Sequence, residues 1–382
     1  MNKNKLFAVA LTVCAALPLA ACGSGKESST ESKAVSESGE ENKEDYEVTD
    51  MLGRTVKIPG NASKYACIGA GALRMYTYVA DDKNLVGIED VELSWGEKGR
   101  PYNMSIPNLK ELPVIGPGGP GNGPNAEALF AAKPDVIFTG YNTDISSVNE
   151  LQEKTGIPVV AISYGKGKTG AGKIFDRNIY DSISLVGKIT GNEDRANDVV
   201  SYIQAAKTDL EKRTENVNPV RAYLGAQSFK GAHGIESTTG DYEIFDVLKA
   251  KNVVNEKGIN DYTMLDKETV LGLDPEVIIL DAGGMSLVKE DYNNNPDFYK
   301  SLSAVRNGKT YIQMPFNNYI TNIDIALADA YYTGKVLYPD AFSDIDPAEK
   351  FDEITQYLLG INAYEKIASQ YYGGYQQANL DR

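Results

Sequence analysis

Two well-separated stretches, 125–137 and 266–278, repeat one pattern of polar and apolar positions. Each opens on a side chain that can cap a helix, carries a glutamate two residues later, reaches a proline and ends in a β-branched run. The pattern predicts a short capped helix, a turn and a buried strand of a parallel sheet. The glutamates, Glu127 and Glu268, then lie in the first helical turn, where the helix dipole favours negative charge. A repeat at this separation indicates two similar lobes instead of a solenoid, whose period would be about 20–50 residues.

Apolar runs around the first stretch alternate between strand-like and helix-like spacing. We predict a hairpin at 50–56, strands at 64–69, 85–88, 136–139 and 159–163, and helices at 71–80 and 146–155. Such a βα alternation implies a parallel sheet with right-handed crossovers.

A long helical region follows the first lobe. Helical spacing of apolar residues runs over 179–189, stops at 190–192 and resumes over 193–214, with Ala196, Val199, Val200 and Ile203 on one face. At about 1.5 Å per residue the second piece spans roughly 30 Å, which is long enough to bridge two lobes.

The second lobe repeats the alternation. We predict strands at 221–225 and 277–280, and a turn plus strand at 307–313. We also predict helices at 243–249, within 296–306, at 322–336 and at 347–357, and a polar, aromatic tail. The fold class is therefore α/β, with parallel-type sheets in two lobes joined by one long spine helix. We divide the chain into an N-terminal lobe (46–172), a linking helical region (173–216), a C-terminal lobe (217–345) and a closing helix with tail (346–382).

The N-terminus has the pattern of a targeting segment. Lys3 and Lys5 precede the apolar stretch 6–21, and Leu19-Ala20-Ala21-Cys22 matches a bacterial lipobox. We therefore expect residues 1–22 to be a lipoprotein signal peptide with Cys22 lipidated, which anchors the protein on the extracytoplasmic face of the cell membrane. The alternative is an ordinary cleaved signal with an incidental cysteine.

The segment 23–45 is rich in Ser, Glu, Lys and Gly, and we expect a disordered tether because it has too little apolar surface to fold. Cys14 leaves with the signal and Cys22 takes lipid, so Cys67 is left alone and no intramolecular disulfide is expected. Cys67 lies in an apolar run and is expected to be a buried strand residue.

Charge and composition exclude several function classes. A formal net charge of −15 and a pI near 4.7 argue against nucleic-acid binding. His233 is the only histidine, so a bare zinc or manganese site built from several imidazoles is excluded and no metal site is predicted. His233 is either an axial haem ligand or an exposed polar residue. The sequence lacks G-x-S-x-G and H-E-x-x-H, and no catalytic residue is assigned.

Taken together, the motifs carry a family resemblance. The two repeats, with Ser303–Tyr311 and Leu337–Phe342, stand in an order that resembles the solute-binding lipoproteins of bacterial ABC importers for iron-siderophores, haem and cobalamin. The resemblance runs from about residue 50 to residue 360. It implies two Rossmann-like lobes on one long helix, a small-molecule ligand held between them, no enzymatic activity, no resident cofactor and a monomeric chain.

The resemblance also implies the partners. In that family, a glutamate on each lobe docks onto arginines of the permease, which works with an ATPase. By motif position these glutamates are Glu127 and Glu268. Two separated carboxylates suit bidentate arginine pairs, which orient the partner and speed the encounter. The alternative for each glutamate is a helix-capping role alone.

Candidate ligand contacts lie in loops that follow strands, because such loops line the crevice of parallel α/β folds. They are aromatic or basic residues: Trp95, Arg100, Tyr102, Tyr141, Tyr164, Phe229, His233, Phe316 and Tyr319, with Arg74 in a helical stretch. Aromatic walls with few cations suit a large metal-organic complex. The alternative is that these tyrosines are half-buried packing residues.

A glycine-rich segment, 116–123, leaves a second ligand class open. It does not lead into Gly-Lys-Ser/Thr, so a nucleotide P-loop is excluded. It is either a surface loop at the rim of the crevice or a nest of N–H groups that binds an anion. With one arginine, such a nest suits the oxyanions molybdate and tungstate, and this is the alternative to an iron or corrinoid complex.

Overall fold

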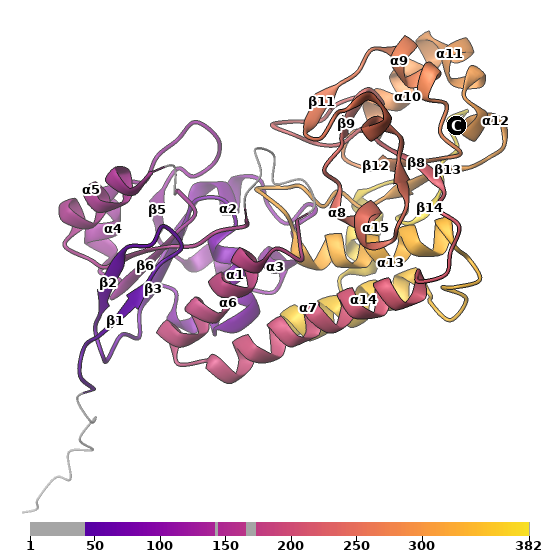
Figure 1. Cartoon of the computed structure of the whole chain (residues 1–382). Coiled ribbons are helices and arrows are strands. Elements are labelled where there is room, and N and C mark those ends of the chain that lie inside the picture. Colours follow the sequence, from indigo (N-terminus) through magenta and orange to yellow (C-terminus); the bar gives the residue numbers. More distant parts are fainter. Residues whose placement is uncertain (1–42, 142–143, 166–172, 382) are drawn as a thin grey trace, which may run out of the picture. The chain divides into compact units, whose positions relative to one another are not determined.

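Two separate sheets carry the fold, as Figure 1 shows for this computed structural model. The structure describes residues 43–141, 144–165 and 173–381. The signal peptide, Cys22 and nearly all of the 23–45 tether therefore lie outside the described residues. Residues 42–382 form one unit. The predicted α/β class is confirmed, whereas the lobe boundaries stay predictions.

The first sheet is parallel and buried on both faces. Alternate residues of its first strand enter different cores: Tyr65 and Cys67 pack on one side, and Ala66 and Ile68 on the other. The strands, in sheet order, are β3 (Tyr65–Ile68), β6 (Val136–Thr139) and β7 (Val159–Ala161). Helices α1 (Ala72–Val79) and α6 (Arg177–Thr190) cover one face, and α4 (Ala126–Ala132) and α5 (Ile145–Thr155) the other.

Two short strand pairs flank this sheet. The predicted hairpin is confirmed as β1 (Tyr46–Thr49) and β2 (Thr55–Ile58), with Gly53 at a φ of 77° in the turn. β4 (Ile88–Glu89) pairs in parallel with β5 (Val114–Gly116). The predicted strand 85–88 is therefore shifted, because only Leu85 bridges to β3 and the strand itself ends on Glu89.

The second sheet has more strands, and helices again alternate with strands along the chain. Its strand order is β10 (Lys251–Asn252), β8 (Arg221–Gly225), β12 (Val277–Asp281), β13 (Thr310–Gln313) and β14 (Gln376–Gln377). α8 (Glu243–Val247) and α13 (Ile323–Leu337) lie on one side. α9 (Lys267–Leu273), α10 (Met285–Asn294), α11 (Pro296–Ser301) and α12 (Ser303–Arg306) gather on the other.

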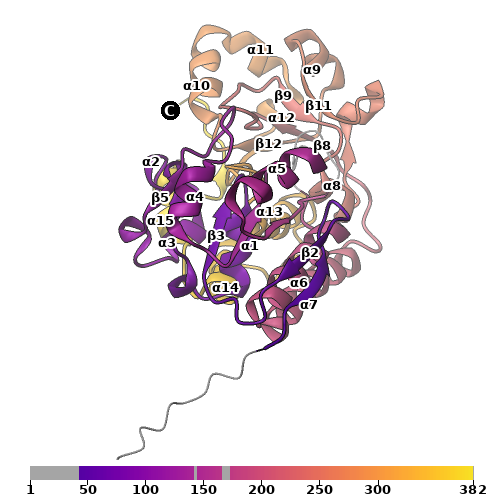
Figure 2. The same ribbon diagram turned by 90° about the vertical axis from the view of Figure 1, so that its left-hand side faces the viewer.

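The linking helices follow the predicted break. α6 ends at Gly191, which caps it in the left-handed conformation, and α7 (Glu193–Arg213) runs on as one helix of 21 residues. Its buried face holds Ala196, Val199 and Ile203, as predicted. α7 packs against α6 and α1 at its start and against α8 and α13 further along, so it contacts helices of both sheets. Figure 2 shows α6 and α7 side by side.

The sequence repeat is a structural repeat. Asn125 accepts a hydrogen bond from the backbone N–H of Ala128 at the start of α4, and Asp266 accepts one from that of Thr269 at the start of α9. Each helix ends on a non-glycine residue in the left-handed conformation, Lys133 or Asp274. A buried strand follows each helix, β6 in the first sheet and β12 in the second.

The C-terminal segment contributes a helix and a strand to the fold. After α14 (Pro347–Leu359) the chain forms α15 (Tyr364–Gln370) and then β14, which pairs antiparallel with β13 and extends the second sheet. The ring of Tyr375 stacks on Tyr332 with centroids 4.2 Å apart. The sequence predicted a polar, aromatic tail here but not the helix α15 or the strand β14.

Short elements complete the chain. They are α2 (Asp90–Ser94), α3 (Pro101–Met104), the antiparallel pair β9 (Ser237–Thr239) and β11 (Tyr262–Met264), and three 3-10 turns at Asp82–Asn84, Leu109–Glu111 and Val253–Lys257. Within the described ranges, every helix is too short or too polar to cross a lipid bilayer. Cys67 is buried in β3, as predicted, and burial raises the pKa of its thiol.

A buried carboxyl group ends the central strand of the second sheet. Asp281 is fully buried, and its Oδ1 accepts a hydrogen bond of 2.7 Å from the backbone N–H of Gly283, while Oδ2 has no partner. Burial raises the pKa of Asp281 from 3.8 to about 7, despite the hydrogen bond from the backbone N–H of Gly283. A second buried carboxyl, Asp329 of α13, also has a raised pKa because of its burial.

The first prediction concerns the pH dependence of stability. Because the pKa of Asp281 is higher in the folded state, its contribution is favourable below pH 4 and is lost as the pH rises towards 7. Asp281→Asn should exceed the wild type in free energy of unfolding by about 1.5 kcal/mol at pH 5 and by about 4 kcal/mol at pH 8. Urea unfolding at both pH values measures this difference, with the exposed Asp340→Asn as control. An equal effect at both pH values would contradict it.

Candidate functional site

Three oxygen-bearing side chains from both sheets meet at the carboxyl ends of the strands. Glu89, the last residue of β4, accepts a hydrogen bond of 2.8 Å at Oε1 from the hydroxyl of Tyr141, which follows β6. Its Oε2 accepts one of 2.9 Å from the hydroxyl of Tyr319, in the loop between β13 and α13. We call Glu89, Tyr141 and Tyr319 the oxygen cluster. Tyr141 and Tyr319 were predicted ligand contacts, and Glu89 was not.

Glycines bring the backbone close to this cluster. The N–H of Gly69 donates to Oε2 of Glu89 over 2.8 Å, and the N–H of Gly119 donates to the hydroxyl of Tyr319 over 3.0 Å. Gly118 has a φ of 64°, and a Cβ there would lie 2.9 Å from the Cβ of Glu89. The glycine-rich segment 116–123 therefore lies against the cluster.

The carboxyl group of Glu89 is almost fully buried. Burial raises its pKa, and the hydrogen bonds from Tyr141, the Gly69 N–H and Tyr319 offset that rise only in part. Glu89 thus accepts three hydrogen bonds at the place where loops from both sheets meet. Because a carboxylate repels anions, this group affects which ligands can bind beside it.

Arg74 holds the loop that carries Tyr319. This residue of α1 is fully buried, and its guanidinium donates to the carbonyls of Asn318 (2.8 Å), Tyr319 (3.2 Å) and Thr321 (2.9 Å). The guanidinium also lies over the ring of Tyr102, 4.5 Å from its centroid. Three of its N–H groups are therefore already used by the protein itself.

The guanidinium of Arg100 is likewise bound by groups of the protein itself. It is fully buried and forms an ion pair of 2.8 Å with Glu92, whose Oε2 also accepts a hydrogen bond of 2.8 Å from the hydroxyl of Tyr102. Its guanidinium also donates to the carbonyl of Gly96. A ligand would have to break this ion pair to reach Arg100. Its predicted role stays untested, as does that of Tyr102, which is buried in the same network.

Trp95 is the exposed aromatic residue beside the cluster. Its side chain is 45% exposed, and its ring meets that of Tyr319 edge-on, with centroids 5.6 Å apart. It therefore offers apolar surface next to the oxygen cluster. Tyr164, which follows β7, is buried and donates a hydrogen bond of 3.0 Å to the carbonyl of Gly71.

The predicted ligand contacts that follow β8, Phe229 and His233, form a second group. Phe229 packs on Tyr262 with ring centroids 4.4 Å apart, and Nε2 of His233 lies 2.8 Å from the carbonyl oxygen of Phe229. Asn317, in the loop that carries Tyr319, donates a hydrogen bond of 2.8 Å to the carbonyl of Ser228 and so links this group to that loop. Phe316 in the same loop is fully buried and packs near Tyr242.

The two repeat glutamates are exposed, in the first turns of α4 and α9. Large apolar side chains lie near each in sequence: Phe130, 62% exposed, follows Glu127, and Met264, 50% exposed, precedes Glu268. Each glutamate therefore has an exposed apolar side chain within four residues of it in sequence.

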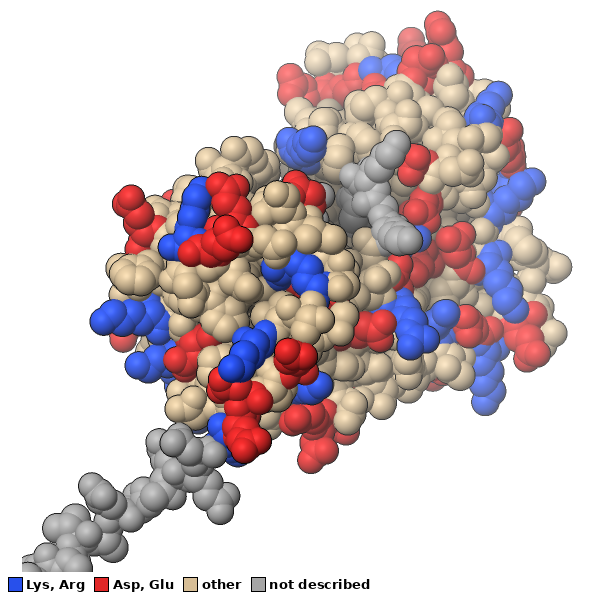
Figure 3. Space-filling view, turned by 60° about the vertical axis from the view of Figure 1, so that its left-hand side comes forward, with Lys and Arg blue, Asp and Glu red and all other residues tan. Residues whose placement is uncertain are grey.

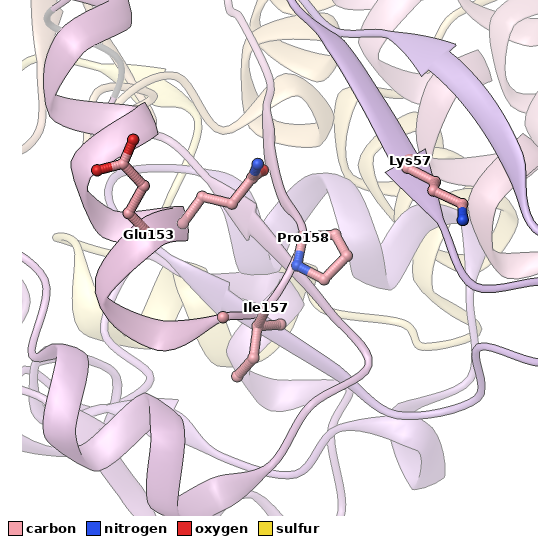
Figure 4. A pocket seen from close by; sticks show the side chains of 6 residues that line it. Lys57, Glu153, Ile157 and Pro158 are labelled. Carbon is pink, nitrogen blue, oxygen red and sulfur yellow. The ribbon is translucent and has the colours of Figure 1, made fainter.

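One surface pocket lies away from the expected ligand site. It is an open depression of about 300 Å³ lined by Lys57, Gln152, Glu153, Gly156, Ile157 and Pro158, and Figure 4 shows its side chains. It lies where β7 begins, whereas ligands of parallel α/β sheets bind beyond the ends of the strands.

The described residues contain no group of three His, Cys, Asp or Glu side chains that could hold a metal ion. Acidic and basic side chains intermingle on the face drawn in Figure 3.

A comparison with known families assigns the chain. The family model described as periplasmic binding protein matches residues 84–314, more than half of the sequence. The chain belongs to the periplasmic binding protein family. The match spans strands of both sheets and the long helix α7.

Curated relatives of this binding protein differ in ligand. The molybdate-binding protein MolA of Haemophilus influenzae is 24% identical over 317 residues, which cover 78% of this chain and 86% of that protein. The Fe(3+)-citrate-binding protein YfmC of Bacillus subtilis is 26% identical over 191 residues, which cover 49% of this chain and 56% of that protein.

Solved structures share the fold of the binding protein. MolA bound to molybdate aligns with a TM-score of 0.64 at 22% identity, covering 83% of this chain and 99% of that one. The TroA-like periplasmic binding protein FepB from Veillonella parvula gives a TM-score of 0.63 at 21% identity, covering 83% and 97%. At these identities the likeness concerns the fold alone.

Sequence reasoning missed Glu89 although a signal was present. Glu89 directly follows the predicted strand 85–88 and so obeys the same rule that selected Tyr141. The candidate contacts named from sequence were aromatic or basic residues, and Glu89 is neither.

The second prediction tests the role of Arg74. Arg74→Met leaves three loop carbonyls without their donor and should lower the free energy of unfolding by about 3–5 kcal/mol. Hydrogen exchange should rise at residues 317–322, because the loop loses its anchor. The control is Arg306→Met, whose exposed guanidinium also donates to carbonyls, of Lys300 and Ser301. Equal losses in both variants would argue against a special role for Arg74.

Proposed function

We propose that the protein is the solute-binding component of an ABC importer that captures an iron-bearing organic complex and delivers it to a permease and its ATPase. The binding is non-enzymatic, and the protein acts as a monomer. The observation that carries this proposal is the family match together with the exposed pair Glu127 and Glu268 on the repeated helices.

The charges near the oxygen cluster favour one ligand class. A small oxyanion needs free cationic or N–H donors, but the guanidinium groups of Arg74 and Arg100 are already bound by carbonyls and by Glu92. The buried carboxyl of Glu89 would repel such an anion. A metal-organic complex does not depend on a free cation of the protein, and the half-exposed Trp95 offers apolar surface to its organic part. Similarity to the Fe(3+)-citrate-binding protein YfmC supports this choice.

The second candidate is a molybdate or tungstate receptor. The likeness to MolA, which extends over most of both proteins, favours it. The glycine-rich segment 116–123 would supply the N–H groups. Measuring the affinity of the protein for iron complexes and for molybdate decides between the two candidate functions.

The lipobox at the N-terminus indicates where the protein acts. We propose that lipid on Cys22 anchors the protein at the extracytoplasmic face and that residues 23–45 connect the anchor to the folded part. Similarity to a Bacillus subtilis substrate-binding lipoprotein, 19% identical over 226 residues, supports this placement.

The third prediction addresses the ligand. Ferric citrate, ferric siderophores, haemin, cobalamin and molybdate are titrated against the purified protein, and native mass spectrometry gives the bound mass. Fluorescence reports from one place, because Trp95 is the only tryptophan. We expect an iron complex to bind and quench Trp95. Binding of molybdate alone would replace the first candidate by the second.

Trp95→Ala extends the same experiment. The exposed indole contributes apolar contact to the ligand, so the variant should bind more weakly, while the free energy of unfolding changes by only about 0.5 kcal/mol. Phe316→Ala is the contrast, because emptying a fully buried aromatic site costs about 3–5 kcal/mol. A large loss of stability in Trp95→Ala would identify Trp95 as a core residue.

The fourth prediction addresses docking. Glu127→Ala combined with Glu268→Ala should abolish uptake in cells while leaving ligand affinity unchanged, because both carboxylates are exposed on the segments that face the permease in this proposal. Glu349→Ala is the matched control, since Glu349 is also an exposed first-turn glutamate of a capped helix, α14. Loss of ligand affinity in the double variant would refute the docking role.

A further inference from the structure

The turn that follows Trp95 rests on the C-terminal helix α15. We call residues 96–99 the wall turn, because Trp95 directly before it offers apolar surface beside the oxygen cluster. The backbone N–H of Gly99 donates a hydrogen bond of 3.0 Å to Oε1 of Gln370, the last residue of α15. These two residues are 271 positions apart in sequence. A long-range contact therefore fixes the end of the wall turn.

Tyr371, which follows α15, packs directly against the wall turn. Gly99 has a φ of 67°, and a Cβ there would lie 2.7 Å from the hydroxyl oxygen and 3.2 Å from Cε2 of Tyr371. The ammonium group of Lys98 lies 5.0 Å from the centroid of the same ring. Because Tyr371 is only 7% exposed, its ring has little room to move away. The close approach therefore requires glycine at position 99.

The helix α15 is itself anchored to the body of the protein. Its residues Ile367 and Ala368 are buried in the main hydrophobic core. The backbone N–H of Tyr364, its first residue, donates a hydrogen bond of 2.8 Å to a carboxylate oxygen of Asp352 on α14. The strand β14, which comes after α15, pairs with β13 of the second sheet. α15 is therefore a fixed support for the wall turn.

The wall turn is also tied to the loop that carries Tyr319. The side-chain amide of Asn318 donates a hydrogen bond of 3.1 Å to the carbonyl of Lys98, and the carbonyl of Asn318 accepts one of 2.8 Å from Arg74. The rings of Trp95 and Tyr319 meet edge-on above these bonds in the two segments. The two segments therefore form one braced surface.

One further contact adds little to this support. Glu97 and Lys366 form an ion pair, but their side chains are 40% and 53% exposed, and ion pairs in water contribute little to stability. The N–H of Gly99 is buried, so loss of its acceptor would leave a donor without a partner. Gln370 and Tyr371 therefore carry most of the contact.

We propose that Gln370 and Tyr371 are positioning residues for ligand binding, which hold the wall turn so that the indole of Trp95 is in place before a ligand arrives. This inference rests on the proposed function, in which Trp95 contacts the organic part of the ligand. A side chain that is already ordered loses less entropy on binding, so releasing it should weaken affinity roughly 2–10-fold.

The first test needs no ligand, because Trp95 is the only tryptophan and its fluorescence reports on the wall turn. In the purified full chain, Gln370→Ala and Gly99→Ala should each lower the fluorescence anisotropy of Trp95 and raise its acrylamide quenching constant. Gln370→Glu keeps an acceptor oxygen for the N–H of Gly99 and should match the wild type.

Two control variants match these substitutions. Gln204→Ala removes an exposed glutamine of α7. Gly156→Ala places alanine at the same φ of 67°, where the added Cβ would meet open space. Both should leave the fluorescence of Trp95 unchanged. Circular dichroism confirms that each variant folds, and where Gly99→Ala does not fold, Gln370→Ala decides.

The second test measures affinity by isothermal titration calorimetry, with ferric citrate, ferric siderophores, haemin, cobalamin and molybdate as probes. Gln370→Ala should weaken binding of the probe that the wild type binds by roughly 2–10-fold. On a Trp95→Ala background the same substitution should have no further effect, because Gln370 acts through Trp95. A merely structural role would lower affinity on both backgrounds.

Several outcomes overturn the inference. These are unchanged fluorescence of Trp95 in Gln370→Ala, unchanged affinity in that variant, and an equal loss of affinity on both backgrounds. In each of these cases a probe still binds to the wild type, so the proposed function stands and the positioning role is wrong. If the wild type binds none of the probes, the proposed function is wrong, and the role in ligand binding is wrong with it.

Discussion

The hydrogen bonds of Arg74 join the two halves of the fold at one point. A single guanidinium on α1 binds three carbonyls of a loop that lies almost 250 residues away in sequence. Because this cation is fully buried, the free energy of its desolvation must be offset by those bonds and by nearby groups such as Asp324. The position of Tyr319, and with it the oxygen cluster, depends on this arrangement.

Because Arg74 holds the loop that carries Tyr319, the oxygen cluster joins residues of different sheets. Glu89 ends β4 and Tyr141 follows β6, whereas Tyr319 follows β13, the last parallel strand of the second sheet. Neither sheet alone supplies all three side chains. The glycines at 69 and 118 complete the arrangement, since side chains there would collide with the neighbouring backbone or with Glu89.

Much of the fold could be predicted from sequence because its signals are local. The capped helices α4 and α9, the strands β6 and β12 and the break between α6 and α7 each depend on a few neighbouring residues. The strand β14 could not be predicted, because two glutamines pair with β13 only through the tertiary fold. Pairings between distant segments leave little trace in the local pattern.

The candidate site was predictable only in part, for the same reason. The rule that loops after strands line a crevice selected Tyr141 and Tyr319, whose hydroxyls both donate to Glu89 in the structure. It did not reveal that Glu92 and the carbonyl of Gly96 already bind Arg100, or that Arg74 is used within the protein. Whether a cation is free depends on its partners in space, which residue type alone does not disclose.

The burial of Cys67 has a practical consequence. Among the residues that the structure describes, it is the one free cysteine, and it lies inside the first sheet with a thiol of raised pKa. A buried, protonated thiol reacts slowly with alkylating reagents. Cysteines introduced at exposed positions on the two sheets would therefore accept spectroscopic labels selectively, and the distance between the sheets becomes measurable in solution without first replacing Cys67.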